Sequence, residues 1–292
     1  MAIGSTDTSE LLKKVRRIEL RTRGLSSQLF SGEYHSAFKG RGMAFSEVRE
    51  YAAGDEIRTI DWNVTARTGV PHVKVFEEER ELTMMLLIDV SASDEFGTTE
   101  MTKRSLVTEL SAVLSFSAIQ NNDKVGVIFF SDRIEEFIPP KKGRSHILMI
   151  IRALLDFKPE GKGTDLSLAL RYLNQVVKKR STAFILSDFM DEGFENALKI
   201  SNKKHDVIAL QVNDPRELEL TNSGVVRFYD AESGQVNWID TSSRKVRRHF
   251  NEEAEAHDAR LKESFRKAGV DHERLMTDKP YILPLMQLFK RR

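Results

Sequence analysis

Short apolar runs alternate with amphipathic stretches along most of the chain. The run at 82–88 has the length of a buried strand, whereas a helix would need more residues and a period near 3.6. Similar runs occur at 124–130, 181–186, 207–212 and 272–276, and helical patterns at 103–119, 145–157, 166–179, 194–202 and 280–289. Strands that alternate with helices of this length predict an α/β fold: a doubly wound, mostly parallel sheet flanked by helices.

Two segments depart from this alternation. Residues 133–138 have the pattern of a short edge strand that Pro139 and Pro140 would end. Residues 225–229 and 236–239 are separated by a polar stretch with Gly234, which predicts a hairpin set into the α/β pattern. A long charged helix is expected to follow at about 244–268.

The first 80 residues have a different character. Helical spacing between 7 and 24 predicts an amphipathic helix, and 31–67 is glycine-rich with little periodicity, which predicts loops with short strands. Residues 72–79 alternate, which predicts an extended segment beside the strand at 82–88. We therefore expect an extension at 1–80, packed on a main domain at 81–292 that carries a hairpin insertion near 225–239.

Composition narrows the classes of function. The 45 basic residues nearly cancel the 44 acidic ones, so no global field favours nucleic acid or an anionic membrane. The absence of cysteine excludes disulfides, thiolate metal sites and cysteine nucleophiles, and it favours the cytoplasm. The N-terminus lacks an apolar signal core, and no segment reaches the roughly 18 apolar residues of a membrane span. We expect no nucleic-acid partner and no direct membrane insertion.

Oxygen-bearing side chains follow three of the predicted elements. Asp89, Ser91 and Ser93 come directly after the strand at 82–88, and Asp188 ends the strand at 181–186. Thr164 stands at the start of a helix, where it is also a good N-cap. Ligands of open α/β sheets bind beyond the carboxyl ends of the strands, so these residues predict a site there if the two strands are neighbours.

Oxygen ligands alone suit a hard cation, and Mg²⁺ (or Mn²⁺) tolerates hydroxyl ligands while keeping part of its water shell. The protein would supply only two negative charges. A cation held in this way keeps an open position, which a carboxylate from another protein would fill. This pattern favours adhesion chemistry over catalysis.

The DxSxS motif, the later threonine and the later aspartate resemble the metal-ion-dependent adhesion site of von Willebrand factor type A domains. The resemblance implies Ser91, Ser93 and Thr164 as direct ligands, and Asp89 and Asp188 as ligands acting directly or through water. All of these positions match the family pattern.

The upstream stretch GDEIRTIDWN at 54–63, followed by Ala66 and Arg67, resembles the bacterial domain-of-unknown-function family fifty-eight, whose members carry such a domain. Because those members commonly neighbour MoxR-type AAA+ ATPases in genomes, the resemblance implies such an ATPase as partner. From the residues themselves, Asp55, Arg58, Asp61 and Arg67 are interpreted as ion pairs around Trp62 that hold the N-terminal segment on the sheet.

Two alternatives remain beside the interaction module. Haloacid-dehalogenase-like phosphotransferases also place an aspartate at a strand end, but they need a second aspartate two residues later, where this chain has Ser91. No GxSxG, GxGxxG or GxxxxGK[ST] motif follows a strand. We expect a non-catalytic, cation-dependent interaction module; the alternatives are a magnesium-dependent phosphohydrolase using the same carboxylates and a metal-free scaffold.

Overall fold

The chain divides into two compact units in the computed structural model. The structure describes residues 13, 15–19, 22, 44–77, 82–91, 101–229 and 236–292. The small unit is Lys39–Leu82, and the α/β unit combines Met1–Phe38 with Thr83–Arg292. The extension expected at 1–80 is thus divided between the two units.

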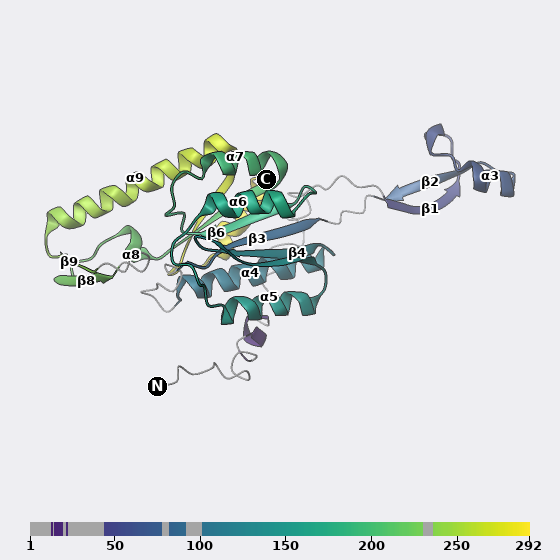
Figure 1. Ribbon diagram of the computed structural model, residues 1–292. Coiled ribbons are helices and arrows are strands. Elements are labelled where there is room, and N and C mark those ends of the chain that lie inside the picture. Colours follow the sequence, from purple (N-terminus) through teal and green to yellow (C-terminus); the bar gives the residue numbers. More distant parts are fainter. Residues whose placement is uncertain are drawn as a thin grey trace. The chain divides into compact units, whose positions relative to one another are not determined.

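A six-stranded sheet forms the centre of the α/β unit (Figure 1). Its order is β10-β7-β6-β3-β4-β5. The strands are β3 (Thr83–Asp89), β4 (Lys124–Phe130), β5 (Ile134–Lys141), β6 (Thr182–Ser187), β7 (Asp206–Asn213) and β10 (Asp271–Met276). Every neighbouring pair is parallel except β4 and β5. The predicted fold class, a mostly parallel sheet flanked by helices, is confirmed.

Helices cover both faces of this sheet. They are α4 (Lys103–Gln120), α5 (Arg144–Asp156), α6 (Leu166–Val176), α7 (Glu195–Lys204), α9 (Arg244–Ala268) and α10 (Ile282–Lys290). Figure 1 shows α6 and α7 on one side of the strands and α4 and α5 on the other. On the α4 side, Tyr281, which precedes α10, donates a 2.9 Å hydrogen bond to Glu109 of α4.

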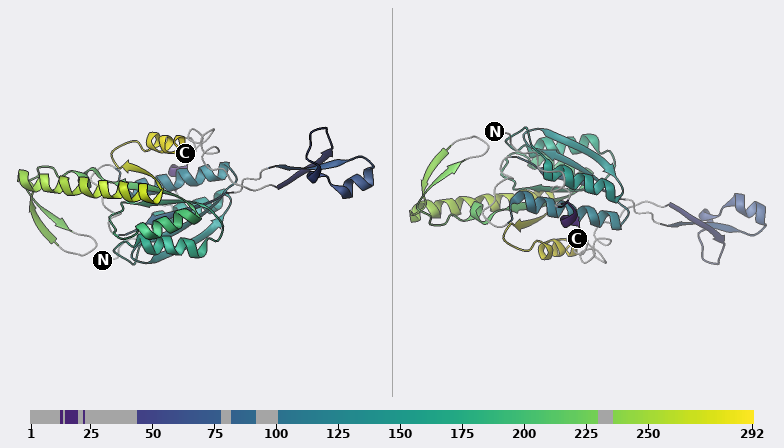
Figure 2. Two further views of the ribbon diagram at one scale, coloured as in Figure 1. Left: turned by 90° about the horizontal axis from the view of Figure 1, so that it is seen from above. Right: turned by 90° about the horizontal axis from the view of Figure 1, so that it is seen from below.

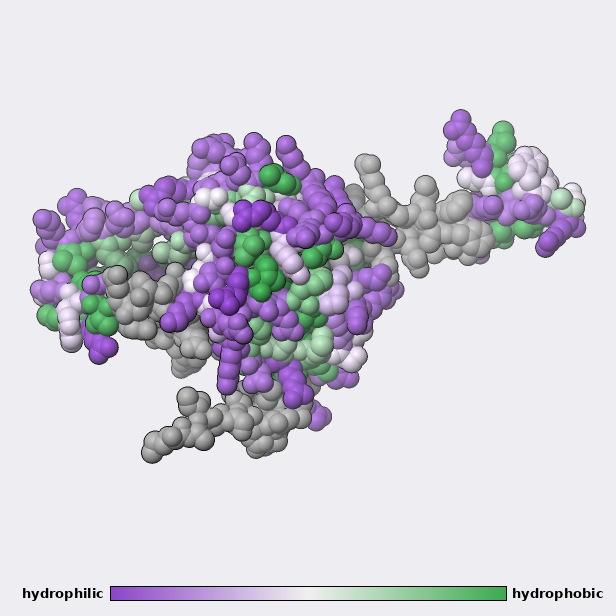
Figure 3. Space-filling model, viewed as in Figure 1, coloured by the Kyte–Doolittle hydropathy of each residue, from purple (hydrophilic) through white to green (hydrophobic). Residues whose placement is uncertain are grey.

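The core is built around β3. Residues 84–88 are fully buried, and Met85 and Leu87 belong to one apolar cluster with side chains of α6, α7 and α9. Because side chains alternate along a strand, Leu86 faces the helices on the other side. Burying each such side chain contributes about 1.5–3 kcal/mol. The outer surfaces of α6, α7 and α9 are mainly hydrophilic (Figure 3), as this arrangement requires.

The edge strand β5 is longer than expected. It runs antiparallel to β4 and continues through Pro139 and Pro140, so the prediction that these prolines end the strand was wrong. Proline is tolerated there because an edge strand has one side without ladder partners. The pairing shifts register near Gly126, where a Cβ would lie 2.8 Å from Met85 Sδ and 2.9 Å from the Pro140 nitrogen.

The expected hairpin is present in the α/β unit. A short helix, α8 (Pro215–Leu218), follows β7, and β8 (Val225–Tyr229) then pairs antiparallel with β9 (Val236–Asp240). The hairpin lies beside the first half of α9 (Figure 2). The backbone N–H of Leu220 donates to Asn251 Oδ1 at 3.3 Å, which ties the start of this insertion to α9.

The small unit is a two-stranded sheet with short helices. β1 (Ala44–Glu50) pairs antiparallel with β2 (His72–Glu77), so the expectation that 72–79 lies beside the central strand was wrong. η1 (Ile57–Thr59) and α3 (Trp62–Thr68) occupy a stretch expected to form loops and short strands. Asp61 caps α3 because its carboxylate accepts from the backbone N–H groups of residues 63 and 64.

The charged block at 54–67 does not surround its tryptophan. Asp55 pairs with Arg49 at 2.7 Å, and Asp61 pairs with Lys74 at 3.4 Å. Trp62 is 67% exposed. The predicted pairs with Arg58 and Arg67 were therefore wrong. Turn geometry explains the difference, because Asp55 also accepts from the backbone N–H of residue 52 and closes the loop after β1.

The described N-terminal residues, 13, 15–19 and 22, are helical, as expected for that segment. Val15 and Glu19 are buried, and Arg144 at the start of α5 donates to the Glu19 carboxylate at 2.6 Å. These contacts anchor the segment to the α/β unit. Among the residues that the structure describes, no helix is both long and apolar enough to cross a membrane.

A buried histidine should make stability depend on pH. His205 is fully buried with its Nδ1 3.0 Å from Ser181 Oγ, and burial, followed by the charges of Lys204 and Arg180, lowers its pKa to about 4. Below about pH 6.5 the histidine is protonated in the unfolded chain but stays neutral in the folded chain. The free energy of unfolding therefore falls as the pH drops toward 4, by on the order of 2 kcal/mol.

We expect His205→Asn to flatten this dependence in part, because His272, whose pKa burial also lowers to about 4, retains its own contribution. Urea denaturation at a series of pH values between 7 and 4 would measure the slope. The matched control is His249→Asn on α9, whose exposed side chain should leave the slope as in the parent. Equal slopes in all proteins would contradict the assignment to His205.

Candidate metal centre

The carboxyl ends of β3 and β6 lie side by side at the point where the strand order of the sheet reverses. β4 follows β3 on one side, and β6, the next parallel strand along the chain, pairs with β3 on the other. Asp89 ends β3, Ser187 ends β6, and Asp188 directly follows β6. The condition set for the predicted site, that these two strands are neighbours, is therefore met. Such a switch point is where open α/β sheets bind their ligands.

Asp89 is surrounded by hydroxyl groups and is 4% exposed. Its Oδ2 accepts from Ser187 Oγ at 2.7 Å and lies 3.4 Å from Thr164 Oγ1, a long contact. Its Oδ1 accepts from the backbone N–H of Ser91 at 3.0 Å, which turns the chain sharply after β3. Three separate chain segments thus bring hydrogen-bond donors to one carboxylate.

Asp188 is held by a lysine. Its Oδ2 accepts from Lys103 Nζ at 2.8 Å, and its Oδ1 accepts from the backbone N–H of Met190 at 3.2 Å. Lys103, the first residue of α4, is 2% exposed and also donates to Glu217 Oε1 at 2.6 Å. Glu217 belongs to α8, so the lysine links the end of β6 to the helix after β7.

The charges of this cluster act on one another. Burial and then the charge of Asp188 raise the pKa of Asp89, hydrogen bonds from Ser187 and Ser91 offset part of the effect, and the resulting pKa is about 6. Burial alone would lower the pKa of Lys103, but Asp188 and Glu217 outweigh it and raise that pKa above its usual value. Three carboxylates, those of Asp89, Asp188 and Glu217, with one ammonium group leave a local excess of negative charge.

The loop that carries Thr164 is fixed on both sides. Gly161 donates its backbone N–H to Glu135 Oε1 at 2.8 Å, and the N–H of Asp165 donates to the carbonyl oxygen of Ser131 at 2.9 Å. Asp165, rather than Thr164, caps α6 by accepting from the backbone N–H of residue 168. The N-cap role suggested for Thr164 is thus taken by its neighbour, and the threonine hydroxyl is directed to Asp89.

Four of the predicted ligands lie in this cluster: Asp89, Ser91, Thr164 and Asp188. Ser93 lies outside the described residues. Sequence reasoning did not assign a role to Ser187, Lys103 or Glu217. Ser187 stands beside Asp188 and could have been considered as a partner of Asp89, but nothing in the sequence around Lys103 or Glu217 distinguishes them from exposed helix residues.

Comparison with known proteins assigns the chain to a protein family. The family model described as "Protein of unknown function DUF58" matches residues 47–260. The chain belongs to the DUF58 family. The resemblance noted at 54–67 is thereby confirmed. An uncharacterized protein of Mycobacterium tuberculosis is 31% identical over 290 residues, which cover 98% of this chain and 91% of that protein.

Two solved structures are similar to this DUF58 chain. An aerotolerance-related membrane protein from Bacteroides fragilis is 16% identical with a TM-score of 0.49, covering 72% of this chain and 100% of that one. The SpRpn10 VWA domain is 10% identical with a TM-score of 0.41, covering 73% and 95%. The fold assignment rests on the sheet order and strand directions of the chain itself.

The chemistry of the DUF58 cluster fits a hard divalent cation. The atoms available as ligands are carboxylate and hydroxyl oxygens, which such cations prefer, and the pKa of Asp89 is raised first by burial and then by the charge of Asp188. No group of three or more His, Cys, Asp or Glu side chains suited to a metal occurs within the described part of the chain. The hydroxyls of Ser91 and Thr164 would therefore have to serve as ligands beside the two aspartates.

Gly161 should be required for this loop. A Cβ at Gly161 would overlap Ser131 Oγ and Asp132 Oδ1, whereas a Cβ at Gly163 would lie an ordinary 3.9 Å from the nearest atom, Asp132 Cβ. We expect Gly161→Ala to lower the free energy of unfolding by about 1–3 kcal/mol, because overpacking forces the loop to move.

Gly163→Ala is the matched control, two residues away in the same loop, and should change the free energy of unfolding by about 0.5 kcal/mol or less. Urea denaturation monitored by circular dichroism measures both. Equal destabilisation by the two substitutions would show that the close contact at Gly161 does not determine the loop.

Proposed function

We propose that this DUF58 protein is a non-catalytic interaction module that binds a partner protein through a divalent cation, Mg²⁺ or Mn²⁺, held at the β3/β6 edge. The observation that supports the proposal is that the buried carboxylates of Asp89 and Asp188 interact through their charges, with the hydroxyl groups of Thr164 and Ser187 beside Asp89. Buried carboxylates this close need a compensating cation, and Lys103 contacts only one of them among the described contacts.

The proposed ligands are Asp89, Ser91, Ser93, Thr164 and Asp188. Asp89 is placed by β3, Ser91 by the sharp turn after it, and Thr164 by the loop anchored at Gly161. Ser187 orients Asp89 through a 2.7 Å hydrogen bond and so acts through that carboxylate. The cation, when bound, would supply positive charge and an open coordination position for an acidic side chain of the partner.

The proposed partner is a protein that offers a carboxylate, and the family resemblance suggests a MoxR-type AAA+ ATPase in the cytoplasm. The absence of cysteine throughout the chain supports a reducing compartment. The balanced charge, 45 basic against 44 acidic residues, supports a protein partner over nucleic acid.

The donor set argues against the phosphohydrolase alternative. A transferase of that kind needs an acid/base group near Asp89. Ser91 stands two residues later, and the Asp188 carboxylate accepts hydrogen bonds from Lys103 and Met190. Neither Ser91 nor Asp188 is therefore suited to protonate a leaving group. A binding role therefore accounts for the arrangement better than turnover does.

Asp89→Asn tests the proposed function. Because Asp89 is buried near a like charge, we expect the substitution to raise the unfolding temperature of the metal-free protein by roughly 2–4 °C. It should also weaken Mn²⁺ or Mg²⁺ binding by about tenfold or more, since a ligand charge is lost. Calorimetric titration with each metal and thermal unfolding with and without it would measure both effects.

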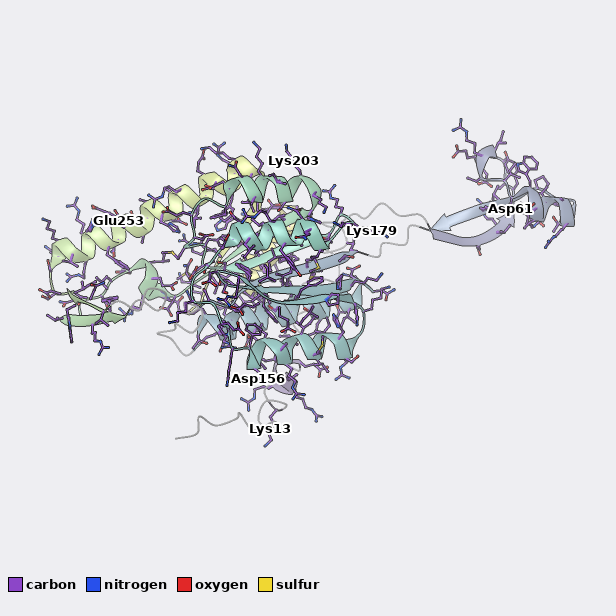
Figure 4. The ribbon with its side chains drawn as sticks, in the orientation of Figure 1. Lys13, Asp61, Asp156, Lys179, Lys203 and Glu253 are labelled. Carbon is purple, nitrogen blue, oxygen red and sulfur yellow. The ribbon has the colours of Figure 1, made fainter. Side chains whose placement is uncertain are left out.

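The matched control is Asp206→Asn, at the opposite end of a strand in the same sheet, where Lys179 marks that edge (Figure 4). It should leave metal affinity unchanged. Retention of a purified MoxR-type ATPase should require metal and Asp89 but tolerate Asp206→Asn. Metal-dependent hydrolysis of an aryl phosphate that Asp89→Asn abolishes would favour the enzyme instead, and a parent protein that binds neither metal would favour a scaffold.

A further inference from the structure

Lys103 is the most unusual charged residue of the cluster. It is 2% exposed, and its ammonium group lies 2.8 Å from Asp188 Oδ2 and 2.6 Å from Glu217 Oε1. It is also the first residue of α4, where the exposed N–H groups of the helix disfavour positive charge. Both its burial and its position therefore oppose a lysine.

The two carboxylates compensate for this cost. Removing a charge from water costs several kcal/mol, and a buried pair recovers it only when the remaining hydrogen-bonding positions are also satisfied. Asp188 meets this condition through the N–H of Met190, and Glu217 Oε2 accepts from Asn213 at 3.2 Å and from the N–H of Asp214 at 3.0 Å. Replacing Lys103 alone by a neutral side chain would leave Asp188 and Glu217 as buried carboxylates without this ammonium group, so the positive charge compensates both of them.

The charge acts where the cation is proposed to bind. Asp188 is a proposed ligand, yet its two oxygen atoms already accept from Lys103 and Met190. An ammonium group on Asp188 competes with a metal ion for the electron density of the same carboxylate and also repels the metal directly. In contrast, Asp89 accepts only from hydroxyl and backbone groups among the described contacts. The two aspartates are therefore not equivalent.

We propose that Lys103 is a positioning residue of the cation site: it holds and partly neutralises Asp188, so that the site binds a divalent cation weakly until a partner carboxylate is added. This inference rests on the proposed function. A weakly held, incompletely neutralised cation attracts a further anion strongly, and linkage then requires the partner to raise the affinity for the cation by the same factor. Lys103 thereby makes partner binding depend on the cation and cation binding depend on the partner.

A set of charge variants tests the inference with the metal alone as probe. Lys103→Met keeps most of the side-chain volume but removes the positive charge, so Mn²⁺ affinity should rise about tenfold. Glu217→Gln removes a negative charge that is not a ligand, so affinity should fall several-fold. The double variant K103M/E217Q has the same net charge as the parent and should bind Mn²⁺ with nearly parental affinity.

Titration calorimetry gives the dissociation constants, and circular dichroism with thermal unfolding shows that each variant is folded. If Lys103 were merely structural, Lys103→Met would lower the unfolding temperature without changing the metal affinity. The double variant would then have the same metal affinity as Lys103→Met. Affinity in Lys103→Met that is equal to or weaker than that of the folded parent would overturn the inference. Unchanged affinity in Glu217→Gln would also count against it, and this variant keeps Lys103 and its contact with Asp188.

The outcomes separate this inference from the proposed function. If the parent binds Mn²⁺ and Lys103→Met binds it no better, the adhesion site stands and the role of Lys103 is wrong. If the parent binds no metal but Lys103→Met does, the lysine occupies the place of the cation and the cation-dependent function of the parent is wrong. If neither protein binds metal, both proposals fail.

Discussion

The parallel pairing of β3 with β6 is the constraint on which the rest of the site depends. Once Ile88 is opposite Leu186, the next residues of each strand, Asp89 and Ser187, must emerge at the same edge. The pairing itself is fixed by burial, because both strands are apolar on both faces and lie between two helical layers. Asp89 and Asp188, which follows Ser187, are thus brought together by the packing of the strands that precede them. Their own charges repel each other.

This placement has an energetic cost that other elements must offset. The pKa of Asp89 is raised to about 6 by burial and by Asp188, so at neutral pH the charged form destabilises the fold. Hydroxyl groups from Ser187 and Thr164 reduce the cost, and Lys103 balances the second carboxylate. Such an arrangement is typical of functional sites, where local stability is given up for a defined interaction.

The sequence predicted the parallel strands and the positions of the four described candidate residues because both depend on local signals. A strand run ending in Asp89, or a polar residue before a helix, is visible within about ten residues. The roles of Lys103 and Glu217 were not predicted because Lys103 is 85 positions from Asp188 and 114 positions from Glu217. Only the sheet order brings these three residues together. In the small unit, α3 was missed and β2 was paired wrongly, since a short alternating segment fits any free strand edge.

The loop after β6 shows why even the local geometry of the site was beyond prediction. Phe189 has a φ of 58°, a left-handed conformation that phenylalanine rarely adopts. Three contacts hold it there: its ring packs 5.1 Å from that of Phe265, its N–H donates to Ser187 Oγ, and His257 Nε2 lies 3.1 Å from its carbonyl oxygen. The conformation turns the chain so that the N–H of Met190 reaches back to Asp188. Strain at one residue, stabilised by α9, therefore helps to hold the carboxylate that Lys103 neutralises, and no pattern in 187–190 reveals it.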